Sequence, residues 1–302
     1  MERFSHAVVI DPTNLTDEGR AELRALCDRV DFFDTAPDGE EETVRRMAGC
    51  DALFVSYKTP ISAAAIASAP GLRYIGMCCS LYGADSANVD IRAAKARGIP
   101  VTGIFDYGDE GVIEYEVAAL VNLLHGFEGP LWRGEPRELG GLKVGIIGLG
   151  TVGIKLARAL QFFGAQLYYF SRTPKPQVEK ELGIRYLPLK ELLQTCDAVS
   201  THLPRGTRLL GREEFAAFTG GKLLLNTSLG DTFDRAALKA WLAEDGDNYY
   251  LCDGCGIGDA APELEGLRGV LLTHQGSGAS LQMNQRLSRK VLDNALAFLQ
   301  GR

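Results

Sequence analysis

The clearest chemical pattern in the chain is the glycine spacing G-x-G-x-x-G at residues 148–153. It follows a short apolar run, 144–147, and leads into a segment with apolar residues at helical spacing that stops at Gly164. A second apolar strand is expected within 165–172. A strand, a glycine turn, a helix and a strand within about thirty residues predict a βαβ unit.

Each glycine of the pattern has a chemical purpose at a dinucleotide site. Gly148 permits a tight turn, Gly150 lets the backbone approach a pyrophosphate, and Gly153 lets the helix pack close to the strand. The first helical N–H groups, at Thr151 and Val152, then face the anion. The alternative is a glycine-rich turn without a ligand, but the flanking strand and helix favour a dinucleotide site.

The residues after the second strand indicate which dinucleotide binds. NAD-binding chains place an acidic residue about 20 residues after the glycines, where it accepts a hydrogen bond from the ribose 2′-hydroxyl. This chain has Ser171, Arg172, Thr173 and Lys175 there instead. Hydroxyls and cations would bind a 2′-phosphate, and no carboxylate would repel it. The sequence therefore predicts NADP rather than NAD, against the alternative of a solvated basic loop.

Composition restricts the class of protein. A chain of 302 residues with 46% hydrophobic content is expected to fold into two domains. The net charge of −7 argues against nucleic acid or an anionic membrane as the main partner. No apolar run approaches the ~20 residues of a membrane span, and no secretory signal begins the chain. The seven irregularly spaced cysteines are expected to be reduced thiols in a cytoplasmic protein.

Apolar runs alternate with helical patterns along most of the chain, which predicts parallel sheets. We expect a hinge at 103–111, a buried helix between domains at 112–124 and a linker at 126–141. The expected strands are 6–11, 30–33, 51–56, 72–77, 99–102, 144–147, 165–172, 184–187, 197–203, 222–226, 249–252 and 270–273. The expected helices are 16–27, 40–48, 62–68, 89–97, 112–124, 154–164, one beginning at 189, 213–218, 234–243 and 285–299.

This order of motifs resembles the D-isomer-specific 2-hydroxyacid dehydrogenases nearly end to end. The resemblance implies two doubly wound parallel α/β domains, a flavodoxin-like substrate domain (1–108 plus 280–302) and a Rossmann NAD(P)-binding domain (109–279). It also implies a cleft between them for nicotinamide and substrate, and a homodimer. The segments that carry the resemblance are 72–90, 112–120, 148–153, 197–204, 225–230, 251–253 and 272–277.

The resemblance also implies roles for single residues. The catalytic histidine of the family falls on His274, and the aspartate that contacts the nicotinamide carboxamide falls on Asp253. An imidazole after a strand end can give a proton to a carbonyl that hydride reduces. The alternatives are a structural histidine and a turn aspartate. Further cofactor contacts implied by the matching segments are His202, Pro204, Thr227 and Ser228.

The chain departs from the family at two catalytic positions. Leu229 stands where the family has an arginine, and leucine cannot hold a carboxylate. The family's glutamate is also missing, and Asp259, one residue away from its place, is the candidate substitute. Loops after predicted strands of the first domain add four candidate substrate contacts, of which the lysine could replace the missing charge: Tyr57, Lys58, Ser80 and Tyr82.

Cys252 and Cys255 have redox or metal spacing, but we favour small buried residues and expect no metal site. The residues together predict an NADP(H)-dependent oxidoreductase acting on a carbonyl or hydroxyl group, with a substrate less acidic than a 2-oxo acid. The alternative is a non-catalytic NADP-binding sensor with the same fold.

Overall fold

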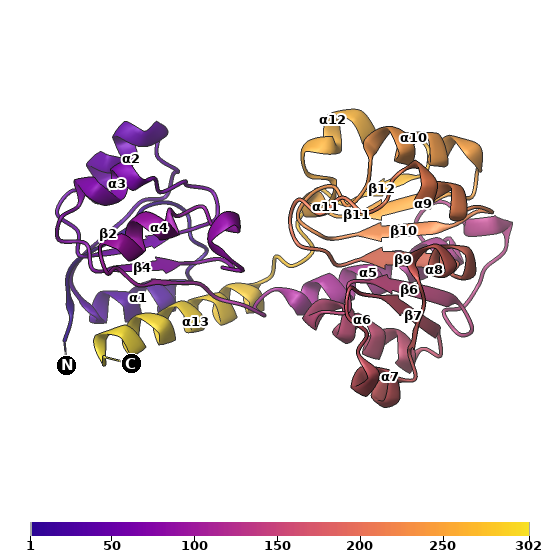
Figure 1. Ribbon diagram of the computed structural model, residues 1–302, viewed down its shortest axis with the longest axis horizontal. Coiled ribbons are helices and arrows are strands. Elements are labelled where there is room, and N and C mark those ends of the chain that lie inside the picture. Colours follow the sequence, from indigo (N-terminus) through magenta and orange to yellow (C-terminus); the bar gives the residue numbers. More distant parts are fainter. Residues whose placement is uncertain (1, 302) are drawn as a thin grey trace. The chain divides into compact units, whose positions relative to one another are not determined.

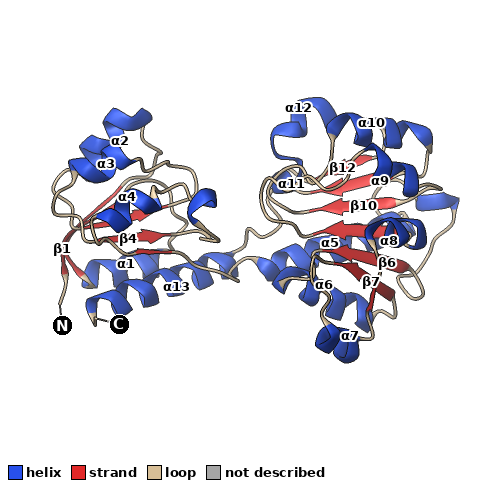
Figure 2. Cartoon of the chain, in the orientation of Figure 1, coloured by secondary structure: helices blue, strands red, loops and turns tan. Residues whose placement is uncertain are grey.

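The structure, a computed structural model, describes residues 2–301 of the chain. These residues form two compact units, which are described separately. Unit 1 comprises Met1–Tyr107 with Ser280–Arg302, and unit 2 comprises Gly108–Ala279. Each unit has one parallel sheet with helices on both faces (Figure 1, Figure 2).

Unit 1 contains a five-stranded sheet in the order β2-β1-β3-β4-β5, the flavodoxin-like order. Alternate strand residues face opposite layers, because side chains in a strand alternate. Val8 and Leu53 pack against the α2–α4 layer, whereas Val9 and Phe54 pack against α1 and α13. The strands are β1 (Phe4–Val9), β2 (Cys27–Phe32), β3 (Ala52–Val55), β4 (Tyr74–Met77) and β5 (Val101–Thr102); the helices are α1 (Asp17–Ala25), α2 (Gly39–Met47), α3 (Ala63–Ser68), α4 (Ile91–Ala96) and α13 (Leu281–Leu299), with a 3₁₀ turn at Ala84–Ser86.

Unit 2 contains a seven-stranded parallel sheet in the order β12-β11-β10-β9-β6-β7-β8. Numbered from β6, this is the Rossmann order 3-2-1-4-5-6 with one further strand. The switch point lies between β6 and β9. The strands are β6 (Lys143–Ile147), β7 (Gln166–Phe170), β8 (Arg185–Tyr186), β9 (Ala198–Thr201), β10 (Leu223–Asn226), β11 (Tyr249–Cys252) and β12 (Val270–Leu272); the helices are α5 (Asp109–His125), α6 (Thr151–Phe162), α7 (Pro176–Leu182), α8 (Leu189–Thr195), α9 (Arg212–Ala217), α10 (Arg235–Glu244), α11 (Gly254–Ile257) and α12 (Ala261–Leu264).

The predicted fold class of two doubly wound parallel α/β sheets is confirmed. Several predicted boundaries are wrong. The last helix begins at Leu281, because the Ser280 side chain caps it by accepting from the Met283 N–H. The short helices α7, α11 and α12 were not expected, since loops rich in glycine or proline gave no helical period.

The segment 126–141 is not a linker. Trp132 is fully buried, and its indole N–H donates to the backbone carbonyls of Gly221 and Asp247 at 3.2 and 3.1 Å. Helix α5 also differs from the expectation of burial on every side. It begins inside the predicted hinge, and its fully buried residues lie along one stripe, at positions 116, 120, 123 and 124.

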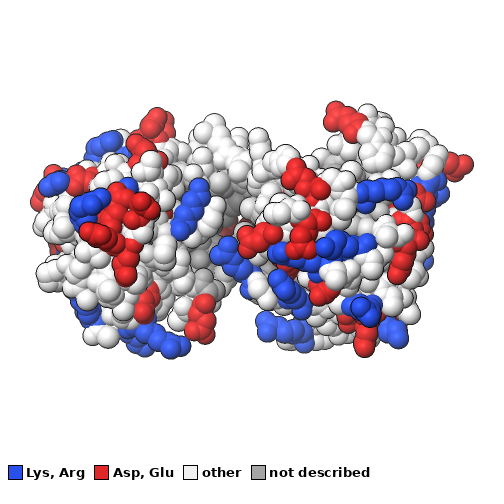
Figure 3. Space-filling model, turned by 90° about the horizontal axis from the view of Figure 1, so that it is seen from above, with Lys and Arg blue, Asp and Glu red and all other residues white. Residues whose placement is uncertain are grey.

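Acidic and basic side chains are interspersed on the visible face of each unit, and no broad patch of one sign covers either (Figure 3). Within the described residues, the structure contains no helix of the length and hydropathy needed to cross a membrane.

Candidate active site

The glycine turn between β6 and α6 has the geometry that its sequence predicts. Gly148 has a φ of +97°, and a Cβ there would lie 2.2 Å from the carbonyl oxygen of His202. At Gly153 a Cβ would lie 2.4 Å from the Gly148 carbonyl oxygen. Real Cβ atoms do not come so close to backbone oxygens, so both positions need glycine for the fold itself.

Gly150 is different, because nothing in the chain requires glycine there. Its φ is −86°, and no heavy atom beyond the adjacent backbone lies within 4 Å of a Cβ built on it. It is the N-cap of the 12-residue helix α6, and no side chain caps that end. The first N–H groups of α6, including those of the exposed Thr151 and half-buried Val152, are therefore open to an anion. An open backbone at a helix N-terminus fits a pyrophosphate.

The loop after β7 is held by two hydrogen bonds to its neighbours. Ser171 Oγ accepts from the Leu149 N–H at 2.9 Å, which ties the loop to the glycine turn. The Lys175 N–H donates to Tyr169 Oη at 2.6 Å, and that hydroxyl donates to Glu179 at 2.6 Å. Burial, followed by the bond to Glu179, raises the pKa of Tyr169 to about 12, so it stays a neutral donor. Arg172 and Thr173 are exposed on this loop.

The ends of β9 and β10 are joined by side-chain bonds. Ser228 Oγ accepts from the Leu203 N–H at 3.1 Å and donates to the Thr201 carbonyl at 2.9 Å. Ser228 thereby fixes the two strand ends relative to each other. Pro204, which follows on the β9 side, is exposed.

The side chains of His202 and Thr227 turn towards a buried glutamate of α5 that the sequence analysis did not single out. Thr227 Oγ1 donates to Glu116 Oε1 at 2.7 Å, and Ser200 Oγ donates to Glu116 Oε2 at 2.8 Å. His202 Nε2 lies 3.0 Å from Ser200 Oγ. The sequence did contain a signal, since Glu116 falls on the same helical stripe as Leu120, but the helix was interpreted as apolar.

Asp253 is 1% exposed, and both of its carboxylate oxygens are bonded within the chain. Oδ1 accepts from the Gly256 N–H at 2.6 Å and caps α11. Oδ2 accepts from the Ser277 N–H and hydroxyl at 2.7 and 2.6 Å. Asp253 therefore holds the loop that follows His274 in place, and a nicotinamide contact would have to share these oxygens.

His274 lies on the loop after β12 with its side chain 75% exposed. The carboxylate beside it is Glu265, whose Oε1 lies 3.5 Å from His274 Nε2. Asp259, the predicted substitute for the family's glutamate, is exposed in the 3₁₀ turn Gly258–Ala260. A glutamate 9 positions before the histidine, at the C-cap of α12, thus pairs with it in place of the aspartate.

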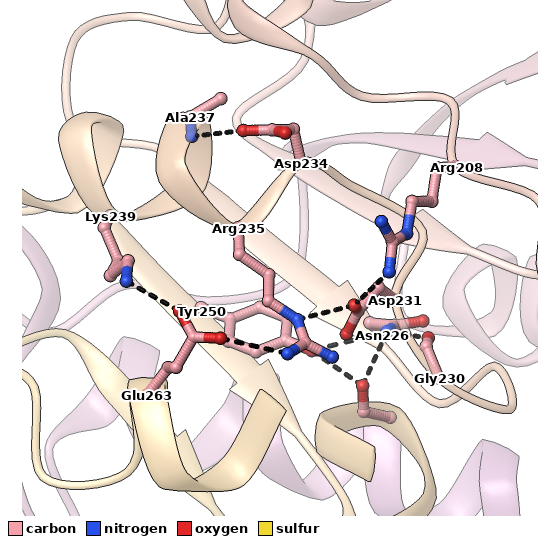
Figure 4. Close-up of polar contacts among 11 residues, drawn as sticks. Arg208, Asn226, Gly230, Asp231, Asp234, Arg235, Ala237, Lys239, Tyr250 and Glu263 are labelled. Carbon is pink, nitrogen blue, oxygen red and sulfur yellow. Dashed lines mark hydrogen bonds and ion pairs between the residues drawn. The ribbon is translucent and has the colours of Figure 1, made fainter. Parts of the chain in front are cut away.

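Leu229 follows β10 and is 51% exposed. The two guanidinium groups that contact the same loop are already paired (Figure 4). Arg208 and Arg235 both donate to Asp231 Oδ2, at 3.1 and 2.7 Å, and Arg235 also pairs with Glu263 at 3.0 Å. Neither arginine is an obvious substitute for the residue that Leu229 replaces.

In unit 1, two predicted substrate contacts lie on a loop fixed by a buried carboxylate. Asp11 is fully buried and accepts from the Ser56 and Thr59 hydroxyls at 2.7 and 2.6 Å. Tyr57 and Lys58 lie between these anchors and are exposed, with the ammonium 5.9 Å from the tyrosine ring centre. The sequence analysis missed Asp11, which sets the shape of this loop.

The other predicted substrate contacts of unit 1 differ in their surroundings. Ser80 is half-buried and hydrogen-bonds with Tyr107, whereas Tyr82 is 77% exposed and packs against Phe105.

The cysteines of unit 2 show no metal geometry. Cys252 is buried in β11, and burial raises its pKa to about 12; burial also raises the pKa of Cys255. Both are therefore protonated thiols at neutral pH. Within residues 2–301, no group of three or more His, Cys, Asp or Glu side chains is arranged to hold a metal ion.

Comparison with known proteins gives the same family as the motifs. The model of the D-isomer specific 2-hydroxyacid dehydrogenase NAD binding domain matches residues 130–273. A glyoxylate reductase from Korarchaeum cryptofilum is 28% identical over 89% of this chain and 85% of its own length. A hydroxypyruvate reductase from Blautia hydrogenotrophica is 26% identical over 97% of this chain and 94% of its own.

A solved structure agrees with these matches at the level of the fold. The apo-structure of D-lactate dehydrogenase from Escherichia coli superposes with a TM-score of 0.79 at 23% identity, covering 99% of this chain and 98% of that one. Residues 130–273 thus match the NAD binding domain of the D-isomer-specific 2-hydroxyacid dehydrogenases, and the chain is similar to reductases of this kind over most of its length. It is a nicotinamide-dependent oxidoreductase of the class that acts on CH–OH donors.

The glycine turn of this dehydrogenase yields a prediction that separates binding from folding. Gly150→Ala should leave the free energy of unfolding within about 1 kcal/mol of wild type, because the added methyl meets nothing. It should nevertheless weaken binding of the nicotinamide dinucleotide at least about tenfold, because the backbone can no longer approach the pyrophosphate.

Gly148→Ala is the matched comparison, because its methyl would meet the His202 carbonyl. It should destabilise the protein by more than about 2 kcal/mol. Chemical denaturation and fluorescence titration measure the two quantities. Unchanged cofactor affinity in Gly150→Ala would place the dinucleotide elsewhere.

Proposed function

We propose that this dehydrogenase uses NADP(H) to interconvert a carbonyl and a hydroxyl group on a substrate that is less acidic than a simple 2-oxo acid. The observation that carries the proposal is the loop after β7, where Ser171, Arg172 and Lys175 stand without a carboxylate. In this proposal unit 2 binds the dinucleotide and unit 1 binds the substrate, as expected for the predicted domains 109–279 and 1–108 plus 280–302.

The loop geometry supports NADP in three ways. Ser171 Oγ accepts from the Leu149 N–H, so its own hydrogen is left to donate to the ribose or its phosphate. The exposed Arg172 provides a planar set of donors for phosphate oxygens. The backbone of Lys175 is fixed by Tyr169, so less conformational freedom is lost when its ammonium binds.

The nicotinamide supplies or accepts hydride, and the chain has to move the accompanying proton. His274 is the candidate for that step, because its imidazole is open to solvent and adjoins Glu265. A glutamate beside the ring stabilises the protonated imidazole and orients it. In this arrangement Glu265, rather than Asp259, performs the orienting role that the family assigns to its own glutamate.

The proposed substrate class rests on the loop after β10, which has Leu229 where the family has an arginine. A carboxylate next to Leu229 would lose water without gaining a guanidinium, because Arg208 and Arg235 are already paired with Asp231. Lys58 and Tyr57, which unit 1 presents on a fixed loop, are proposed to contact the substrate together with Ser80 and Tyr82. A hydroxyl or neutral carbonyl compound suits this set better than glyoxylate.

We also propose that the protein is a cytoplasmic homodimer. The named relatives are oxidoreductases of small molecules, and the cysteines of the described residues are all free. Light scattering on the purified protein distinguishes a dimer from a monomer.

The cofactor proposal predicts tighter binding of NADPH than of NADH. Arg172→Ala should remove a charge-assisted contact to the 2′-phosphate and weaken NADPH binding roughly tenfold to a hundredfold, with NADH unchanged. Arg185→Ala is a control, because Arg185 donates to Tyr168 rather than belonging to the loop. Equal affinities of the wild type for the two dinucleotides would overturn the proposal.

The acid/base proposal predicts that His274→Ala lowers turnover by ~10²–10⁴ while the NADPH dissociation constant hardly changes. Glu265→Gln should lower turnover by about tenfold, since the histidine remains but loses its charged partner. Asp259→Asn serves as the control and should be active. Turnover by His274→Ala at the wild-type rate would assign the proton to another group.

The substrate proposal predicts poor turnover of glyoxylate, pyruvate and hydroxypyruvate. Leu229→Arg should raise kcat/KM for these acids, because a guanidinium can pair with their carboxylate. Leu229→Met is the matched control, since it has similar size and no donor. NADPH oxidation measures both. Wild-type turnover of any of these acids above about 10⁴ M⁻¹s⁻¹ would contradict the proposal.

A further inference from the structure

A buried carboxylate of α5, that of Glu116, lies beside the ends of strands β9 and β10 in unit 2. Glu116 is 0% exposed, although it lies on α5 only 7 residues into the helix. Its two oxygens accept from Thr227 Oγ1 at 2.7 Å and from Ser200 Oγ at 2.8 Å. A buried charge is costly unless it is hydrogen-bonded, and here both oxygens are satisfied.

The position of Glu116 follows from strand alternation. Ala198 and Ser200 of β9 share the face towards α5, and so do Leu223 and Leu225 of β10. His202 and Thr227 are the first residues after these strands and continue the alternation. Each strand face is therefore apolar where the strand begins and polar at or just after its carboxyl end. The stripe of α5 matches it, since Leu120 and Leu124 meet the apolar part and Glu116 meets the polar end.

The hydrogen bonds continue to His202 in a defined direction. Ser200 has a single hydroxyl hydrogen, which Glu116 accepts, so the 3.0 Å contact with His202 requires Nε2 to donate. His202 Nε2 therefore carries a hydrogen in this chain of hydrogen bonds. Among the described residues, His202 Nε2 is the basic group within ion-pair distance of the carboxylate, at 3.7 Å. No lysine or arginine in that set neutralises the carboxylate directly.

This cluster adjoins the glycine turn. The carbonyl of His202 is the group against which Gly148 packs, so the cluster begins at the switch point between β6 and β9. A dinucleotide bound at a switch point lays its two halves over the strand ends on opposite sides. With the pyrophosphate at the glycine turn, the nicotinamide half would lie at the ends of β9 and β10.

We propose that Glu116 is a buried charge of the dinucleotide site that favours the oxidised nicotinamide. Its carboxylate also holds Thr227 and His202 in place at the strand ends. The oxidised ring carries a positive charge and the reduced ring is neutral, so a fixed negative charge in a low-dielectric region discriminates between them. Stronger binding of the oxidised form shifts the equilibrium on the protein towards reduced substrate.

The inference rests on the nicotinamide cofactor of the family, and not on the choice of NADP or on the substrate. Its test is therefore a binding measurement with both redox forms. Calorimetric titration of NADP⁺ and NADPH gives the ratio of their dissociation constants; NAD⁺ and NADH replace them if the protein prefers that pair. If the protein does not prefer NADP, the ratio of the two dissociation constants can still be measured. The proposal on cofactor choice and the proposal on Glu116 can therefore fail independently.

Glu116→Gln removes the charge and keeps the size. We expect the affinity for the oxidised form to fall roughly tenfold relative to the reduced form. Glu116→Met should give the same shift in the ratio of affinities. It serves as a second variant if Glu116→Gln does not fold, because well-packed apolar replacements of buried ions are tolerated. Glu116→Asp keeps the charge and should keep the wild-type ratio.

Glu114→Gln is the control for the helix, because Glu114 is exposed two positions earlier on α5. It should change neither affinity. An unchanged ratio in Glu116→Gln and Glu116→Met would overturn the proposal, whether both affinities stay the same or both fall equally. An equal fall would show that Glu116 only supports the fold.

Discussion

The close approach of two backbones underlies everything in unit 2 that can hold a dinucleotide. The turn after β6 passes so near the carbonyl of His202 that Gly148 has no room for a side chain. This contact places the open end of α6 directly beside the end of β9. The uncapped helix terminus and the polar strand ends therefore lie next to each other within the unit.

Polar groups in this part of unit 2 are fixed by one another rather than by solvent. Ser171 bonds the glycine turn, Ser228 bonds the β9 end, and Asp253 bonds the loop that follows His274. Fixed donors lose little entropy when a ligand binds, and they can act on a developing charge without reorganisation. The buried Glu116, in the layer beneath the strand ends, is likewise held by hydrogen bonds within the protein.

The sequence predicted the glycine turn, the parallel sheets and the family well, because these depend on local spacing and on strand periodicity. It failed where a side chain meets a residue far along the chain. Glu116 bonds Thr227 across 111 positions, and Asp11 bonds Thr59 across 48, so neither partner is visible locally. The segment with Trp132 was interpreted as a linker because composition does not show what buries an indole.

The histidine partner was missed for a related reason. Asp259 stands nearer to the family's pattern, but the carboxylate that lies beside His274 is that of Glu265, at the C-cap of α12. The sequence pattern did not show this contact.

A crystal structure of the protein with NADPH tests the central claim, that the glycine turn, the β7 loop and the β9–β10 ends form one dinucleotide site. The account predicts the pyrophosphate at Gly150, the 2′-phosphate in contact with Arg172 and Lys175, and the nicotinamide above the strand ends that Glu116 supports. A 2′-phosphate in solvent, or a ring on the β7 side of the switch point, would contradict it.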